Sequence, residues 1–234
     1  LLLVLSLIFT GQIASAATYY VTNEEEEFIQ FNRGMATNKD FSILYENELI
    51  GDGNWFEEYQ SIQDYANSSY AYFNYEYASW DYEDVPDGDS MRMKIDFRWW
   101  GYETEEETEY VYKTIREIIR NNPSITKASD YDKATWAYNW VVNNVKYDYT
   151  YKKHSAYSGL TDDTVCDGYA KIFYVFATEL GLDCLIVSGV ADGLGGWGGH
   201  AWNLVKMEGD EWYVVDTTWG ATGKKDYLLK GNNY

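Results

Sequence analysis

Cys166, His200 and Asp216 supply a nucleophile, a base and a carboxylate within one part of the sequence. A cysteine attacks a carbonyl carbon only as its thiolate, and it needs a base that is itself oriented by a third group. Taken singly, each residue has an ordinary structural role, as a buried thiol, a structural histidine or a turn-capping aspartate. The combination indicates thiol chemistry, provided that the fold brings the three side chains together.

Cys166 lies in the first turn of a predicted helix. Apolar positions recur after it at helical spacing, namely Tyr169, Ala170, Phe173, Ala177 and Leu180, and Gly181 marks the end. Asp163 or Thr164 is expected to cap the start. Unpaired N–H groups and the helix dipole favour negative charge there, so we expect a lowered thiol pKa and N–H donors for an oxyanion.

A hairpin is expected to bring His200 close to Asp216. His200 opens the strand-like run "HAWNLVKM" after two glycines, and "EWYVVDTTW" returns after the turn "EGDE". The start of one antiparallel strand faces the end of the other, which predicts an imidazole oriented by a carboxylate. The other histidine, His154, lies in the polar segment "YKKHSAYSG" and is interpreted as solvated.

The remaining pattern predicts an α+β domain over residues 96–234. An alternating strand is expected at "MRMKIDFRWW", followed by helices that begin at a Thr104–Glu107 capping box and near Ser129. After the cysteine helix come "DCLIVSGV", a glycine-rich loop "ADGLGGWGG", and the hairpin. We therefore expect an architecture in which helices come first and an antiparallel sheet then packs on the cysteine helix.

Two further regions precede this domain. Residues 17–95 are Tyr-rich and acidic and are interpreted as β-containing, with Tyr75 and Tyr77 in a strand and a turn at Pro86-Asp87-Gly88. Residues 1–16 form an apolar run ending in an A-x-A site, which predicts a signal peptide. We therefore expect a secreted protein, extracellular or at the cell surface.

Composition excludes several classes of partner. The net charge of −20 over 234 residues argues against nucleic acid and anionic membranes, which need clustered Lys and Arg. The chain has no further apolar stretch long enough for stable membrane insertion. Two cysteines leave open a Cys166–Cys184 disulfide, which would silence Cys166 as a nucleophile. A metal site built from these thiols and His200 lacks a fourth ligand, so no metal is predicted.

Three motifs, "VCDGYA", "GHAWN" and "WYVVDTTW", resemble the Cys, His and Asp motifs of the transglutaminase-like superfamily, in its bacterial branch of papain-like thiol enzymes. The upstream "YDKATWAYNWVVNNVKYD" and the closing "DYLLKGN" are similar to flanking family segments, so the resemblance covers about residues 105 to 234. Two positions depart from it. Thr164 stands where relatives often carry Gly, and Gly220 where many carry Asp.

The resemblance implies acyl transfer through a thioester, without a cofactor, in cross-linking, deamidation or proteolysis. It makes Cys166 the nucleophile, His200 the base and Asp216 its orienter, and a protein or peptide the substrate, with a cell-wall or extracellular protein as partner. The Cys166 N–H is one expected oxyanion donor, and the second is sought between residues 147 and 157. The residues expected to line the oxyanion and substrate site are Tyr149, Tyr157, Trp202 and Trp219. The alternative is a non-catalytic extracellular binding or scaffold module with the same fold.

Overall fold

A computed structural model of the chain describes residues 17–21, 26, 29–30, 33–34, 41–45, 75–84, 91–99, 103–193, 196–223 and 227–231. Every structural statement below refers to these residues. The signal peptide predicted at 1–16 and the turn predicted at Pro86-Asp87-Gly88 lie outside them.

Within the described residues, the N-terminal region contributes a sheet of order β1-β2-β4-β3. Its strands are β1 (Ala17–Val21), β2 (Phe41–Tyr45), β3 (Tyr75–Asp84) and β4 (Met91–Trp99). β1 and β2 are parallel, and the other pairs are antiparallel. The strand expected at "MRMKIDFRWW" is confirmed as β4. β4 crosses the predicted boundary between residues 95 and 96, and it ends at Trp99.

The predicted helices begin where the sequence places them, and they are α3 (Glu105–Arg120), α4 (Asp130–Asn144) and α6 (Cys166–Glu179). The 3-10 helix η2 (Ile125–Lys127) and the short helix α5 (Ala156–Thr161) were not predicted. Thr104 and Glu107 form the expected capping box, and the Ser129 side chain caps α4. These caps satisfy backbone N–H groups that have no partner within their helix.

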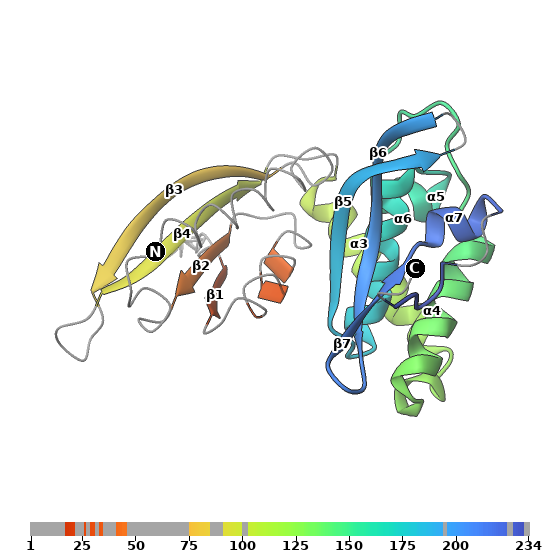
Figure 1. The fold of residues 1–234 in the computed structure, drawn as a ribbon, viewed down its shortest axis with the longest axis horizontal. Helices are drawn as coiled ribbons and strands as arrows, with labels where there is room; N and C mark the ends of the chain where they lie inside the picture. Colours follow the sequence, from red (N-terminus) through yellow and green to blue (C-terminus); the bar gives the residue numbers. More distant parts are fainter. Residues whose placement is uncertain are drawn as a thin grey trace, which may run out of the picture.

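A second sheet packs on these helices, with order β5-β6-β7 and antiparallel pairing throughout. Its strands are β5 (Cys184–Gly193), β6 (Gly196–Met207) and β7 (Glu211–Val215), followed by α7 (Thr217–Ala221). Figure 1 shows α3, α4, α5 and α6 on one face of this sheet. The mixed helical and antiparallel architecture agrees with the α+β prediction.

Two segments differ from the sequence prediction. The glycine-rich segment expected as a loop continues the ladder instead, with Val190 paired to Gly199 and Ala191 to Gly198. Glycine retains both backbone hydrogen-bonding groups, so it extends a hairpin that its neighbours have begun. The final strand stops at Val215, because Asp216 turns the chain and caps α7.

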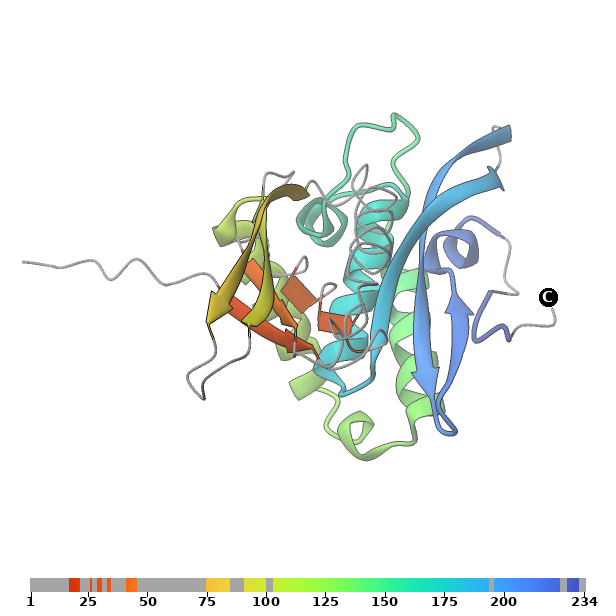
Figure 2. The same ribbon diagram turned by 60° about the vertical axis from the view of Figure 1, so that its left-hand side comes forward.

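Helix α6 is the centre of the core. Every residue from Cys166 to Ala177 is buried, since helices surround one side of α6 and the β5–β7 sheet covers the other. Figure 2 shows α6 standing between these layers. Phe41 and Ile43 of β2 belong to the same apolar cluster. In the described part of the chain, no helix is both long and apolar enough to cross a membrane.

Candidate active site

Cys166 is the first residue of α6, but the predicted cap of that helix is wrong. Val165 is the cap residue, and it makes no side-chain cap hydrogen bond. The Thr164 hydroxyl is turned away and donates to the carbonyls of Lys153 and Ser155, each at 3.0 Å. Asp163 pairs with the Lys153 ammonium. Both candidate caps are therefore used to fasten the preceding segment to α6.

His200 and Asp216 are in direct contact, as the hairpin predicts. The His200 Nε2 atom lies 2.6 Å from Oδ2 of Asp216, and both side chains are buried. The other carboxylate oxygen, Oδ1, accepts a hydrogen bond from the Trp219 backbone N–H at 2.9 Å. Asp216 thus holds the imidazole and caps α7 at the same time, so α7 fixes the direction of the carboxylate.

Two tryptophans hold the plane of the imidazole. The Trp219 ring stacks on His200 at 5.0 Å between centroids, with an interplanar angle of 16°. Trp202 stacks at 5.9 Å. Gly189 leaves room for that indole, because a Cβ atom there would come within 2.8 Å of it. Both tryptophans therefore contact the His200 imidazole.

The Cys166 thiol lies against strand β6, at the residue that follows His200. Its sulfur interacts with the backbone N–H of Ala201, the residue after His200, and with the N–H of Asp167. The sulfur also lies 3.4 Å from Oδ1 of Asp167. The start of α6 thus faces the strand that carries His200.

The pKa of the Cys166 thiol is raised, contrary to the expectation from its helix position. Burial is the largest cause, and the neighbouring Asp167 carboxylate adds to it. The N–H groups of Ala201 and Asp167 act in the opposite direction without compensating. Loss of hydration outweighs the helix terminus here, so the resting thiol keeps its proton at neutral pH.

Both cysteines are free, so the disulfide left open by the sequence is absent from the structure. Cys184 pairs with Val205, which lies four residues along β6 from Ala201, the residue whose N–H interacts with the Cys166 sulfur, and four strand residues span about 13 Å. A disulfide needs Cα atoms within about 7 Å of each other. Cys184 is instead buried under Asn203, whose amide nitrogen is 3.8 Å from its sulfur. No metal-binding group of three His, Cys, Asp or Glu side chains occurs in the described ranges.

The interpretation of His154 as a solvated loop residue is wrong. Its Nδ1 atom lies 2.5 Å from Oδ2 of Asp167, the residue that follows Cys166. The imidazole is 27% exposed and the carboxylate 2%. A sequence signal existed, because an acidic residue beside a helix-start cysteine is buried there and needs a cation. The segment between residues 145 and 165 that positions His154 follows no simple period.

The two predicted tyrosines have different environments. Tyr149 is 66% exposed, and its ring contacts Tyr147 at 5.1 Å. Burial raises the pKa of Tyr147, and the nearby Cys166 adds to that rise, so this ring pair lies on the thiol side of the domain. Tyr157 instead packs edge-on against Tyr110 of α3 at 5.2 Å. The described ring contact of Tyr157 is thus with α3 and not with the imidazole.

Both departures from the family pattern have a structural basis. Thr164 supplies the hydroxyl that fastens the Lys153–Ser155 segment. At Gly220, a Cβ atom would come within 2.2 Å of the Tyr138 hydroxyl oxygen and 2.8 Å of Val142. A Cβ atom at position 220 would therefore force the Tyr138 and Val142 side chains to move, so the observed packing favours glycine there.

Comparison with known proteins finds a family and relatives for part of this chain. Residues 119–217 match the model of the transglutaminase-like superfamily. The chain is 32% identical over 108 residues to kyphoscoliosis peptidase of Mus musculus, and 34% identical over 104 residues to that of Homo sapiens. These matches cover 40% and 38% of this chain but only 16% and 15% of the relatives' lengths.

A solved structure described as a TGase aligns with a TM-score of 0.42 and 15% identity, over 93% of this chain and 62% of that one. The family match spans Cys166, His200 and Asp216 and confirms the resemblance of their motifs. Residues 119–217 of this chain therefore form a domain of the transglutaminase-like superfamily.

Proposed function

We propose that this protein is a thiol enzyme that attacks amides of proteins or peptides, with Cys166 as nucleophile, His200 as base and acid, and Asp216 as orienter. The observation that carries the proposal is the buried His200–Asp216 contact of 2.6 Å, on the strand whose Ala201 N–H faces the Cys166 sulfur. The family match and the similarity to two peptidases support the same class of chemistry.

In the proposed reaction, His200 takes the Cys166 proton as the sulfur bonds to the carbonyl carbon of the amide. The C–N bond then breaks, and His200 returns the proton to the departing amine, which leaves a thioester. Water or a primary amine attacks the thioester and gives its proton to His200. The C–S bond then breaks, and His200 returns the proton to the sulfur, which restores the thiol. Because the resting thiol is protonated, the base removes the proton during attack.

The backbone N–H groups at the start of α6 are the proposed oxyanion donors, beginning with that of Cys166. The cap residue Val165 contributes no side-chain acceptor to this turn. N–H groups directed at the developing charge lower the barrier for acyl transfer by a few kcal/mol, about 3–4 for a single donor.

The test is turnover of a glutamine-containing peptide, with and without a primary-amine probe, followed by mass spectrometry. Amine incorporation, deamidation and chain cleavage give different mass changes and so identify the acceptor and the bond. We expect one of these activities in the wild type and its loss in Cys166→Ala and His200→Ala. Asp210→Asn, at an exposed turn position, is the matched control. Full turnover by Cys166→Ala would refute the proposal.

A binding or scaffold role is the second candidate, favoured by the burial of the thiol and its raised pKa. A wild type without turnover that captures a glycan or peptide would support it. We also propose that the protein acts outside the cell, on the basis of the apolar run and A-x-A site at residues 1–16. Detection of the protein only inside cells expressing this sequence would contradict that location.

A further inference from the structure

We propose that His154 and Asp167 form a second imidazole–carboxylate pair whose shared proton sets how readily Cys166 ionises. Both are positioning residues, because they act through the thiol and need not touch a substrate. The inference rests on the proposed function, in which Cys166 is the nucleophile.

One carboxylate joins the second imidazole to the thiol. Asp167 directly follows Cys166 in the first turn of α6, and its side chain is 2% exposed. Its Oδ1 atom faces the Cys166 sulfur at 3.4 Å, and its Oδ2 atom faces Nδ1 of His154 at 2.5 Å. A buried carboxylate needs a partner, and this one has a thiol on one oxygen and an imidazole on the other.

The chain on either side of His154 is fastened to the start of α6. The Lys153 carbonyl accepts from the Val165 N–H at 2.8 Å, and the Thr164 hydroxyl reaches the carbonyls of Lys153 and Ser155 at 3.0 Å. Gly168 permits this approach, because a Cβ atom there would come within 2.5 Å of the Ser155 oxygen. These hydrogen bonds on either side of His154 hold its backbone next to the start of α6, where Asp167 lies.

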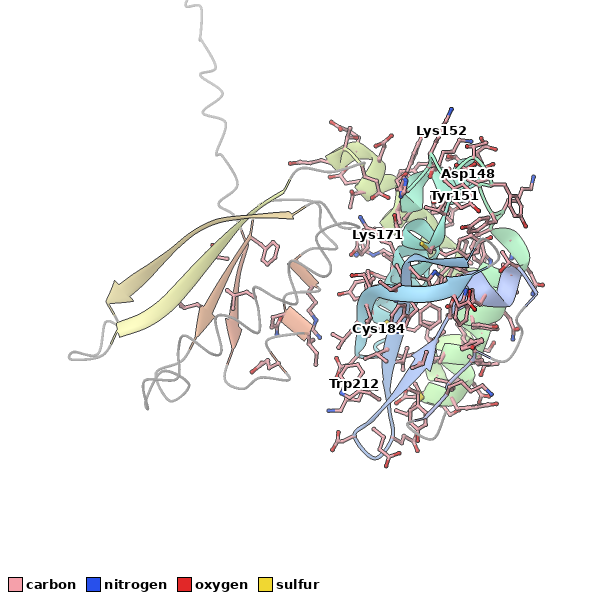
Figure 3. All side chains as sticks on the ribbon, turned by 45° about the horizontal axis from the view of Figure 1, so that its top comes forward. Asp148, Tyr151, Lys152, Lys171, Cys184 and Trp212 are labelled. Atoms are coloured by element: carbon pink, nitrogen blue, oxygen red, sulfur yellow. The ribbon has the colours of Figure 1, made fainter. Side chains whose placement is uncertain are left out.

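The loop before His154 is equally well defined. The Asp148 carboxylate accepts from the N–H groups of Thr150, Lys152 and Lys153 at 2.7, 2.9 and 3.0 Å. It thereby holds Tyr151 at a φ of 57°, a left-handed conformation that is unfavourable for a bulky residue. His154 also bonds to the Tyr151 backbone. Figure 3 shows Asp148, Tyr151 and Lys152 gathered at one end of the domain, far from Trp212.

The charges around the pair come from several elements. His154, Cys166 and His200 of β6 each act to lower the pKa of Asp167, against the effect of burial. His200 is itself bonded to Asp216. Other groups near the pair or its loop are Asp148 and Tyr147, Lys153 bonded to Asp162 and Asp163, and Lys171 bonded to Glu103. The two nearby lysines thus have carboxylate partners of their own, and the His154 imidazole is the basic group bonded to Asp167.

The sign of the effect follows from the proton held by the pair. The hydrogen bond to Asp167 raises the pKa of His154, while burial raises that of Asp167 and His154 opposes this rise. With one shared proton, the pair is neutral; without it, a net negative charge lies beside the sulfur and opposes thiolate formation. Loss of His154 therefore makes Cys166 less acidic, and loss of Asp167 makes it more acidic.

The test is the rate of Cys166 alkylation by iodoacetamide at pH 8, followed peptide by peptide so that Cys184 is counted separately. A charge within a few Å shifts a pKa by about 1 unit or more, which changes the thiolate population about tenfold. We expect His154→Gln to react about ten times more slowly than the wild type and Asp167→Asn about ten times faster. The double variant should react like Asp167→Asn, because the charge that His154 compensates is then gone.

Asp162→Asn is the matched control, since it removes a carboxylate that is 67% exposed and bonded to Lys153. It should leave the alkylation rate unchanged, and circular dichroism should show that all variants fold. A purely structural role predicts changes of the same sign in both single variants. That result, or equal rates in all variants, would overturn the inference.

The outcome is independent of turnover, because iodoacetamide needs no acyl substrate. Opposite shifts in the two variants without amide turnover by the wild type would refute the proposed function alone. Amide turnover by the wild type with no such shifts would refute this inference alone.

Discussion

His200 and Asp216 are 16 residues apart in the sequence, and their Nε2 and Oδ2 atoms are 2.6 Å apart in the structure. The hairpin turn between β6 and β7 brings them together, and the start of α7 directs the carboxylate. The Trp219 backbone N–H donates a hydrogen bond to the other carboxylate oxygen of Asp216. Orientation of the His200 imidazole thus depends on the turn into α7 as well as on the hairpin.

Asp216→Asn should abolish most activity while leaving the fold intact. Asparagine still accepts the Trp219 N–H and caps α7, but it no longer stabilises a protonated His200. We expect kcat to fall at least about 100-fold, with a melting temperature within a few degrees of the wild type. Steady-state kinetics and thermal unfolding measure the two effects, and Asp210→Asn is the control. An unchanged kcat would show that Asp216 only caps α7.

Trp219→Ala should lower kcat by removing the ring that stacks on His200. A base displaced by about 1 Å loses up to about 100-fold in rate, and we expect a loss between 10- and 100-fold here. Trp219→Phe retains an aromatic face and should lose less. Trp212→Ala, on β7 opposite Lys206, serves as the control. Equal kcat in the Ala variant and the wild type would exclude a positioning role for this ring.

The alkylation rate of wild-type Cys166 should keep rising with pH beyond about 8.5, the pKa of a free thiol. Burial and Asp167 raise the pKa of Cys166, so the thiolate is a minor species at neutral pH. Iodoacetamide kinetics from pH 6 to 10 measure the profile. A plateau below pH 7 would instead indicate a resting thiolate–imidazolium pair.

Breaking the buried Glu103–Lys171 ion pair should destabilise the domain. Lys171 Nζ lies 2.8 Å from Glu103 Oε2, with side-chain exposures of 8% and 3%. Glu103 also accepts the Tyr157 N–H at 2.9 Å, so it ties α6 to the start of α5. We expect Glu103→Gln to lower the free energy of unfolding by about 3–5 kcal/mol, because Lys171 is left buried without its counter-charge.

This contribution should depend on pH in a defined direction. Burial acts to raise the pKa of Glu103, but Lys171 and the hydrogen bonds prevail and hold it below the ordinary value of 4.5. The stabilisation is therefore present above pH 4.5 and is lost as the pH falls through the lower folded-state value. Urea unfolding at several pH values should show the gap between wild type and Glu103→Gln narrowing only below pH 4.5. A gap that is constant down to pH 3 would contradict this assignment.

Two free thiols should be titrated in the unfolded protein without any reductant. Cys166 and Cys184 are both free and buried, at the start of α6 and the start of β5. Reaction with Ellman's reagent in guanidinium chloride gives the count directly. A count of zero would indicate a disulfide and therefore a different arrangement of α6 and β5.

Local sequence patterns were sufficient to predict most of the helices and strands of the domain. The capping box at Thr104 and Glu107, the cap at Ser129, and the apolar spacing after Cys166 all lie within a few residues of the helix they define. The turn around Gly209, with its φ of 95°, likewise determines the hairpin and thus the approach of His200 to Asp216. Short-range periodicity and turn chemistry carry this information because each depends only on neighbouring residues.

Tertiary structure decided what depends on burial and on distant segments. The sequence predicts an acidic thiol from the helix start, whereas packing between α6 and β6 removes water and raises its pKa. The sequence shows no helical or strand periodicity in the segment around His154. The position of this segment is set by hydrogen bonds to Thr164 and Val165, which directly precede α6. The sequence by itself determined which groups are present and which elements carry them. Desolvation and long-range hydrogen bonds, which arise only when the segments pack, decided their ionisation and their partners.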